Sequence, residues 1–387
     1  MTRHFLRMRS GSPFSALLFL MAFAACGSDS SGGEGGAAAD SIPADSAQSA
    51  SEPPHAVGPA TDLPPNELGE IMVLEYHRLG EPESEFYRSV ANFRSDLQRL
   101  YEGGYRPITV RQMLEGDINL PQGTSPVVFT IDDASTGQFY YLPDGSIDPN
   151  SMVGIWEAFA RENPGWDGGA TWCVLPAAEH PSNFFSEKPD REIPREQREA
   201  AIKKKVDHLL AGGHEICNHT LYHARLDSAS GDAQAQEWIG RGEDSIQVYL
   251  PADYDIVTLA LPLGMWPQNR ELAVRGSYNG SAYENEGVLE VAGGPSVSPF
   301  DREFDPHSID RMPVSPNVLE RQLATYDSTP ARRYVSDGDA NVISVPAGGE
   351  GRVATNRSTG KQVRPVAASA AAPAPAAQPA AATPPAQ

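Results

Sequence analysis

Short apolar runs alternate along the middle of the chain with segments whose apolar residues recur at helical spacing. Five runs rich in apolar and β-branched residues predict buried strands: 71–76, 127–131, 170–175, 214–218 and 256–261. Three segments between them predict helices: 93–100, 153–161 and 195–211. Strands that alternate with helices pair in parallel through right-handed crossovers. The pattern therefore predicts an α/β fold, and both a closed barrel and an open sheet agree with it.

The N-terminal end of the chain lacks this alternation. A basic start and an apolar run over 14–25 predict an export signal at 1–25, because the run is too short to span a bilayer. The run ends in Phe-Ala-Ala-Cys, which resembles a bacterial lipobox with Cys26 as the lipidated residue. Plain cleavage after Ala25 is the alternative. We therefore expect an exported protein, anchored through Cys26 to a bacterial membrane and facing the periplasm or the exterior.

Two further segments are too poor in large apolar residues to fold alone. Residues 26–66 are rich in Ser, Gly, Ala and Pro, which is typical of a flexible tether. Residues 351–387 are assigned to a disordered tail, whose end consists largely of Ala and Pro. A single domain at 67–350 remains.

Composition narrows the class of protein. The 387 residues include 51 acidic and 30 basic side chains, and this net charge of −21 argues against nucleic acid as a partner. The three cysteines exclude a disulfide scaffold, and the absence of a C-x-x-C pair argues against a zinc knuckle. Cys173 and Cys217 lie in predicted strands that could be neighbours. Export would permit a disulfide between them, but their apolar surroundings favour two buried thiols.

Polar residues follow three of the predicted strands, where an α/β fold places its active face. These residues are His77, the pair Asp132 and Asp133, and the pair His219 and His223. The i, i+4 spacing brings the last two imidazoles to one side of a turn, and imidazole with carboxylate suits zinc and similar ions. Consecutive residues of a strand point in different directions, so one aspartate would bind the ion and the other would act as a general base.

Each pattern also has a structural explanation. An isolated H-x-x-x-H is frequent by chance, and an Asp-Asp pair at the end of a strand is frequently a turn or a helix cap. No G-x-S-x-G elbow is present, so the chain shows no nucleophile of the serine-hydrolase type.

The combination of motifs resembles a known family. Thr-Ile-Asp-Asp at 130–133 and Asn-His-Thr-Leu-Tyr-His at 218–223, preceded by Gly-His-Glu-Ile-Cys at 213–217, are similar to the motifs of NodB-homology polysaccharide deacetylases, carbohydrate esterase family four. The resemblance implies a distorted (β/α) barrel of about seven parallel strands in a single domain. It also implies Asp132 as the general base. Asp133, His219 and His223 would be the ligands of a divalent metal, with zinc expected and cobalt, nickel or iron as alternatives.

The general acid of the family normally comes from a late L-x-H motif, which we do not find. Val-Leu-Glu-Tyr-His at 73–77 has the required form at the other end of the chain. It resembles the circularly permuted, biofilm-type deacetylases, and this implies His77 as the general acid. Leu-Pro-Leu-Gly at 261–264 resembles the third motif but lacks the arginine that orients the base. Pro262 and Trp266 are the expected substrate-binding residues.

The function predicted from the sequence is a metal-dependent hydrolase of the cell envelope. Its substrate would be an acetylated polysaccharide, either an N-acetylglucosamine-type polymer or acetylated xylan. Two alternatives stay open. The first is a catalytically weak or inactive glycan-binding lipoprotein on the same fold, and the second is an esterase that removes only O-acetyl groups.

Overall fold

The computed structural model of this chain describes residues 58–177, 184 and 195–367. The predicted export signal, the lipidation site at Cys26, residues 26–57 of the tether and residues 368–387 of the tail lie outside the described residues. None of the described helices is long and apolar enough to span a membrane.

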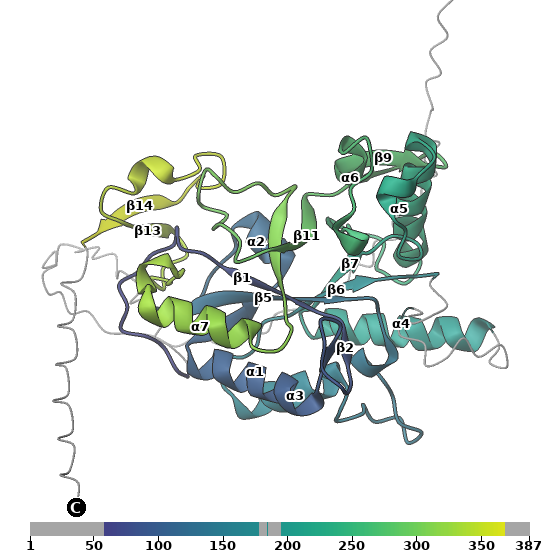
Figure 1. Cartoon of the computed structure of the whole chain (residues 1–387), viewed down its shortest axis with the longest axis horizontal. Helices are drawn as coiled ribbons and strands as arrows, with labels where there is room; N and C mark the ends of the chain where they lie inside the picture. The colour runs from purple at the N-terminus through teal and green to yellow at the C-terminus, as the bar shows by residue number, and fades with distance from the viewer. Residues whose placement is uncertain (1–57, 178–183, 185–194, 368–387) are drawn as a thin grey trace, which may run out of the picture. The chain divides into compact units, whose positions relative to one another are not determined.

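Seven parallel strands close into a barrel at the centre of the molecule (Figure 1). Their order around the ring is β1 (Met72–Tyr76), β12 (Ile309–Pro313), β11 (Gly287–Gly293), β8 (Thr258–Ala260), β7 (Glu215–Asn218), β6 (Thr171–Val174) and β5 (Ser125–Asp132). Strand β1 pairs with both β12 and β5, which closes the ring. An eighth strand, β4 (Tyr105–Ile108), pairs with the first half of β5. The predicted single-domain (β/α) barrel of about seven parallel strands is confirmed.

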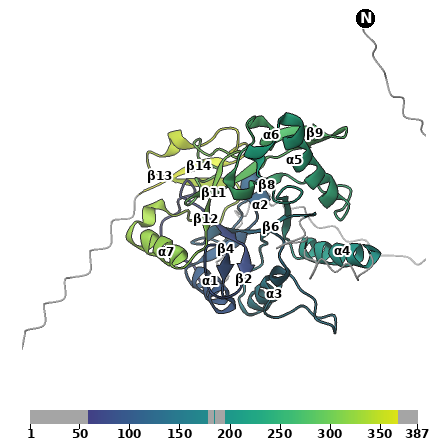
Figure 2. The same cartoon turned by 45° about the vertical axis from the view of Figure 1, so that its right-hand side comes forward.

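Helices surround the barrel (Figure 2). They are α1 (Val90–Glu102), α2 (Val110–Glu115), α3 (Met152–Glu162), α4 (Arg195–Ala211), α5 (Asp232–Gln247), α6 (Glu271–Val274) and α7 (Val318–Ser328). Two of the predicted helices begin at serine caps, because the Ser89 and Ser151 hydroxyls accept backbone N–H groups of the first turn of α1 and α3. Helix α4 has the predicted bounds.

Alternate strand residues face two different parts of the core. Met72 and Leu74 of β1 and Phe129 of β5 belong to a cluster that also contains buried side chains of α1, α3, α4 and α7. Their neighbours Val73 and Val128 belong to a second cluster, with side chains of β6, β7, β8 and β11. The first cluster is therefore the layer beneath the helices, and the second fills the barrel.

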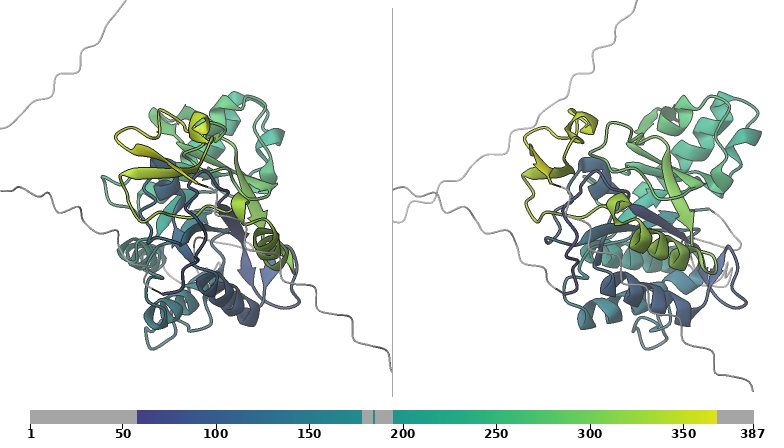
Figure 3. Two further views of the ribbon diagram at one scale, coloured as in Figure 1. Left: turned by 90° about the vertical axis from the view of Figure 1, so that its left-hand side faces the viewer. Right: turned by 60° about the vertical axis from the view of Figure 1, so that its left-hand side comes forward.

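The C-terminal part of the chain covers the amino-terminal end of the barrel. Strand β13 (Val342–Pro346) contributes buried side chains to the barrel cluster, and it pairs in parallel with β14 (Gln362–Val366). Figure 3 shows these strands in yellow. The backbone carbonyl of Tyr334 accepts a hydrogen bond from Ser125, the first residue of β5. The opposite end of the barrel stays available for a site.

The described residues make contacts with the barrel domain beyond both predicted boundaries, 67 and 350. At the N-terminal side, Thr61 donates its backbone N–H to Gly123 (2.9 Å) and Arg106 donates to the carbonyl of Pro59 (2.8 Å), so 58–66 belong to the domain. At the other side, β14 lies inside the predicted tail. Four of its five residues are exposed, so it lacks the apolar run that identifies a buried strand in the sequence.

The expectation of two buried thiols is also wrong, because Cys173 and Cys217 form a disulfide. The two residues are direct partners in the parallel register of β6 and β7. Both lie in the cluster that fills the barrel. Sequence gives the strands but not their register, and the register decides whether the two sulfurs meet.

Candidate active site

The predicted catalytic and metal-binding residues meet at the carboxyl ends of the barrel strands. His77 follows β1, Asp132 ends β5 and Asp133 follows it, and His219 follows β7, with His223 four residues later. All five line one cavity of about 760 Å³. This is the end of a (β/α) barrel where active sites are found.

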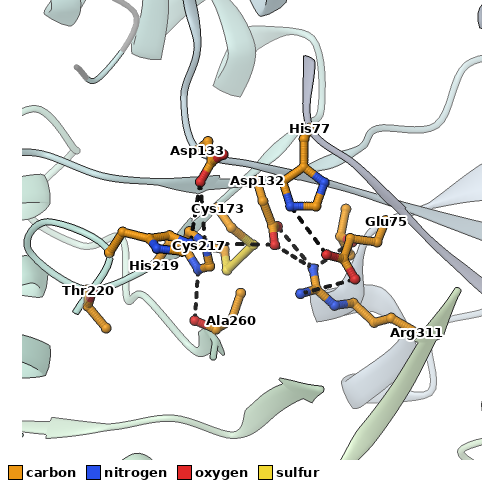
Figure 4. A network of polar contacts seen from close by, with 12 residues as sticks. Glu75, His77, Asp132, Asp133, Cys173, Cys217, His219, Thr220, Ala260 and Arg311 are labelled. Carbon is orange, nitrogen blue, oxygen red and sulfur yellow. Dashed lines mark hydrogen bonds and ion pairs between the residues drawn. A yellow bond between two sulfur atoms is a disulfide. The ribbon is translucent and has the colours of Figure 1, made fainter. Parts of the chain in front are cut away.

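Asp133, His219 and His223 form a cluster that fits a metal ion. Their ligand atoms all lie within 4.8 Å of one another, and Asp133 Oδ1 is 3.7 Å from Nε2 of each histidine. His219 Nδ1 lies 2.9 Å from the backbone carbonyl of Ala260, so this nitrogen carries the proton. Its Nε2 is buried without a hydrogen-bond partner and faces the aspartates (Figure 4). A carbonyl that fixes the tautomer in this way is typical of a histidine that binds metal.

Strained backbone holds these side chains in place. Four residues of the site have positive φ angles, between 50° and 80°, which residues other than glycine rarely adopt: Asp133, Ala134, Thr220 and His223. Thr220 is fixed at both ends. Its N–H donates to Asn218 Oδ1 (2.9 Å), and its hydroxyl accepts the N–H of Ala224 (3.0 Å). Such strain concentrates at functional sites, where the surroundings impose the geometry.

Asp132 also contacts an arginine that was not expected from the sequence. Arg311 of β12 is fully buried, and its Nη1 donates to Asp132 (2.9 Å) and to Thr130 Oγ1 (3.0 Å). Its Nη2 lies 3.5 Å from Glu75 Oε2. The segment 261–264 lacks the arginine of the motif that it resembles. Strand β12 instead supplies the arginine that contacts Asp132. The signal for it was a charged residue inside the short run 309–313, next to apolar neighbours.

His77 lies on the other side of Asp132 from the metal cluster. Its Nε2 is 3.4 Å from Glu75 Oε1, and its ring meets the ring of Phe86 edge to face, with centroids 5.2 Å apart. Glu75, His77 and Asp132 could geometrically hold a second ion. The Arg311 guanidinium already pairs with both carboxylates of this group, so a second cation would be repelled.

Burial and Arg311 act in opposite directions on the carboxylates of the site: burial raises their pKa values, and the guanidinium lowers them. Burial alone would raise the pKa of Asp132, but Arg311, together with the neighbouring His219 and His77, more than offsets burial and holds that pKa below its usual range. Burial raises the pKa of Glu75 to about 8, although Arg311 lowers it in part. Burial lowers the pKa of His77, and burial with the neighbouring His219 lowers the pKa of His223. The site therefore combines an ionised Asp132 with two histidines, His77 and His223, whose pKa values are lowered.

Arg78 of the short strand β2 (Arg78–Leu79) forms an ion pair with Asp133, one of the three residues that fit a metal ion. Its Nη2 lies 3.3 Å from Asp133 Oδ2, while Oδ1 of the same carboxylate faces the two histidines. Strand β2 pairs with β3 (Tyr87–Arg88), and this holds Arg78 over the site. Arg78 leaves one carboxylate oxygen directed at the position of an ion.

The predicted substrate-binding residues Pro262 and Trp266 do not line the cavity, whereas Leu261, Leu263 and Met265 do. Leu263 has a φ of 59°, and the turn around it directs alternate residues towards the site. Trp266 instead donates to Glu290 (3.0 Å), and Arg270 covers its ring at 3.7 Å. Its ring is therefore engaged elsewhere. Trp172 is buried in the core.

Comparisons with known proteins give similar folds and no sequence relative. No protein-family profile and no curated protein matches the chain. A Streptococcus pyogenes deacetylase, PplD, solved with acetate, is 17% identical over 66% of this chain and 97% of that one, with a TM-score of 0.45. IcaB from Ammonifex degensii is 18% identical over 68% and 97%, with a TM-score of 0.45. A Bacillus cereus polysaccharide deacetylase is 15% identical over 66% and 68%, with a TM-score of 0.46.

Proposed function

We propose that this protein is a metal-dependent hydrolase that removes acetyl groups from a polysaccharide. One observation carries the proposal. An Asp-His-His cluster with an unpartnered His219 Nε2 lies beside a buried aspartate that Arg311 keeps ionised. The two motifs around these residues resemble those of polysaccharide deacetylases, which supports the same chemistry.

Asp132 is placed to act as the general base. A divalent ion held by Asp133, His219 and His223 would polarise the acetyl carbonyl and make water more acidic. Asp132 Oδ2 lies 3.8 Å from His219 Nε2, so it borders the same space and can take the proton of an attacking water. Arg311 fixes the orientation of this carboxylate. The neutral side chains Leu175 and Leu261 of the cavity wall suit the acetyl methyl group.

His77 is placed to act as the general acid. One ring nitrogen of His77 lies within 4.8 Å of a carboxylate oxygen of Asp132. His77 directly follows β1, the strand that pairs with β5. When the carbon–nitrogen bond breaks, acetate leaves with the added hydroxyl, and the sugar amine needs a proton. His77 can supply it. Loss of an alcohol from an ester depends less on this proton, because an alkoxide is a better leaving group than an amide anion.

We also propose that the protein acts at the cell envelope, anchored through Cys26. The basic start, the apolar run over 14–25 and the following cysteine support export and lipidation. A tether would then hold the barrel away from the membrane surface. Mass spectrometry of the mature N-terminus would test both the cleavage site and the lipid.

The first experiment measures acetate release by the chain from residue 27 onward, with zinc or cobalt added. N-acetylglucosamine oligomers and acetylxylan are compared side by side, and Asp132→Asn is the control. Release from one substrate that the control abolishes would support the activity and identify the bond. No release from either, with metal bound, would contradict it and favour a glycan-binding role.

The role of His77 has its own test. We expect His77→Gln to lower the rate of amide deacetylation about 100-fold, because no other group would protonate the leaving amine. Hydrolysis of O-acetyl groups should fall by less than about tenfold. A variant that keeps full turnover on N-acetylglucosamine oligomers would exclude His77 as the acid.

A further inference from the structure

Exposed apolar side chains gather at the mouth of the active-site cavity. The described residues include six large apolar side chains that are well exposed: Phe86, Tyr87, Tyr222, Val248, Leu263 and Val363. Three of them, Phe86, Tyr222 and Leu263, line the cavity that contains the metal cluster. Exposed apolar surface is unfavourable in water, so its concentration at one cavity indicates a ligand.

Phe86 is held at the mouth by its neighbours. It lies between β2 and β3, is 45% exposed, and its ring edge contacts the imidazole of His77. The backbone on both sides is fixed, since the carbonyl of Phe86 accepts the N–H of Arg78 (3.1 Å) and Arg88 forms a buried ion pair with Asp96 (2.6 Å). The exposed part of the ring is therefore presented to the cavity by a rigid support.

Tyr222 is presented from the metal-binding turn. It lies between Thr220 and His223, both of which have left-handed backbone, and it is 44% exposed. Its ring packs against Trp238 at 6.3 Å, with the planes inclined by 70°. The turn thus directs His223 into the site and Tyr222 to its rim.

A second cavity adjoins the first at Glu85. It has a volume of about 660 Å³ and extends to Arg321 and Gln322 of α7. Glu85 immediately precedes Phe86. A ligand longer than one sugar residue can therefore lie along the surface on both sides of Glu85.

We infer that Phe86 and Tyr222 form an aromatic pair that stacks against sugar residues flanking the acetylated one. This inference rests on the proposed function, and it specifies how a polymer would be held. Sugar rings carry apolar C–H faces beneath polar edges, and aromatic side chains match such faces while the edges stay in water. Among the other candidates, Trp266 is covered by Arg270, and Trp156, Trp166 and Trp172 are buried.

The test compares a hexamer of N-acetylglucosamine with 4-nitrophenyl acetate, a small ester that cannot reach both rings. Phe86→Leu and Tyr222→Leu should each raise KM for the hexamer about fivefold, with a much smaller change in kcat. The loss of kcat/KM on the small ester should be clearly smaller. Phe86→Tyr and Tyr222→Phe keep a ring and should restore the KM of the wild type.

Val248→Ser is the matched control, because Val248 is an exposed apolar residue at the end of α5, outside the cavity, and this variant should leave both activities unchanged. Thermal unfolding checks that each variant folds. A hexamer KM within about twofold of the wild type in both leucine variants would overturn the inference. Equal losses on hexamer and ester would also overturn it, since the rings would then act through His77 or the metal cluster.

A binding measurement separates this inference from the proposed activity. If the wild type releases no acetate, calorimetry with the hexamer and zinc still reports on the aromatic pair. Weaker binding by the leucine variants would support the pair while the activity fails. Equal binding by wild type and variants, or no binding by any of them, would overturn it.

Discussion

A single buried arginine controls the charge of the site. Arg311 contacts Asp132, Thr130 and Glu75, which come from two other strands. Of the two carboxylates, Asp132 is closer to the guanidinium, at 2.9 Å against 3.5 Å for Glu75. The positive charge of Arg311 therefore compensates Asp132 first, and burial leaves Glu75 the more easily protonated of the two.

Replacing Arg311 should change the pH dependence of hydrolysis in a defined direction. In Arg311→Gln, burial is offset less, so the pKa of Asp132 rises and the acid limb of kcat/KM moves to higher pH. At neutral pH, kcat/KM should fall about 100-fold. Arg311→Lys keeps a charge and should move the limb less. An unmoved acid limb in a folded Arg311→Gln protein would show that Asp132 is not the base.

His214 makes a second residue-scale prediction, about stability. Burial lowers the pKa of His214 to about 4. Its Nδ1 accepts the backbone N–H of Ala170 (2.8 Å), a hydrogen bond that only the neutral ring can accept. The unfolded chain takes up the proton near pH 6.5, whereas the folded protein does not. The stabilisation is therefore complete above pH 6.5 and is lost as pH falls towards 4, by about 3 kcal/mol.

Urea unfolding at pH 7 and pH 4.5 checks this prediction. His214→Asn keeps an acceptor for the Ala170 N–H and does not titrate in this range. Its free energy of unfolding should therefore depend less on pH than that of the wild type. The same pH dependence in both proteins would contradict the role of His214.

At the scale of elements, the disulfide links two adjacent barrel strands. Cys173 lies opposite Asp132 in the register of β5 and β6, and opposite Cys217 in that of β6 and β7. The covalent bond therefore fixes the wall of the barrel beside Asp132, the proposed general base. Cross-links of this kind stabilise a fold mainly by restricting the unfolded chain.

Removing the disulfide should lower stability without changing the fold. The bond closes a loop of 44 positions, so a Cys173→Ala, Cys217→Ala protein should lose about 4 kcal/mol of unfolding free energy in urea. The wild type treated with dithiothreitol under unfolding conditions should approach the variant, which itself should not respond. Equal stability of oxidised wild type and variant would mean that the bond does not constrain the unfolded chain.

The elements differ in how well sequence predicts them. The strands at 71–76 and 127–131 were predictable because each begins with at least three consecutive apolar residues, and the helix at 195–211 because Ile202, Val206 and Leu209 recur at helical spacing. Strands β11 and β12 were missed, since Glu290 and Arg311 interrupt their apolar runs. Asp133, His219 and His223 were predictable from two local sequence motifs. Arg311, Phe86 and the disulfide depend on which strands and loops become neighbours, and local spacing carries no such information.

At the scale of the whole molecule, the domain is longer than its apolar pattern indicates. Ala354 donates its N–H to Phe300 (2.8 Å), and Arg352 pairs with Asp301. Strand β14 then pairs with β13 over five positions. These contacts join the segment after residue 350 to the layer that closes the amino-terminal end of the barrel.

Two truncations test this boundary. A chain that ends at residue 350 should be less stable in urea than the full chain by about 3 kcal/mol, because it exposes β13 and loses its hydrogen bonds. A chain that ends at residue 367 should match the full chain within about 0.5 kcal/mol. Equal stability of the two truncated proteins would show that the segment 351–367 belongs to the tail and not to the folded domain.

The closure of the barrel by β1 has a consequence for the order of folding. The ribosome makes β1 first, yet β1 gains its second neighbour only after β12 exists, and Arg311 follows Asp132 by 179 positions. Contacts so distant along the chain form late, because they must close long loops. A nascent chain that stops before β12 would hold both metal motifs but no arginine to keep Asp132 ionised. Hydrolysis would therefore begin only when synthesis of the barrel is complete.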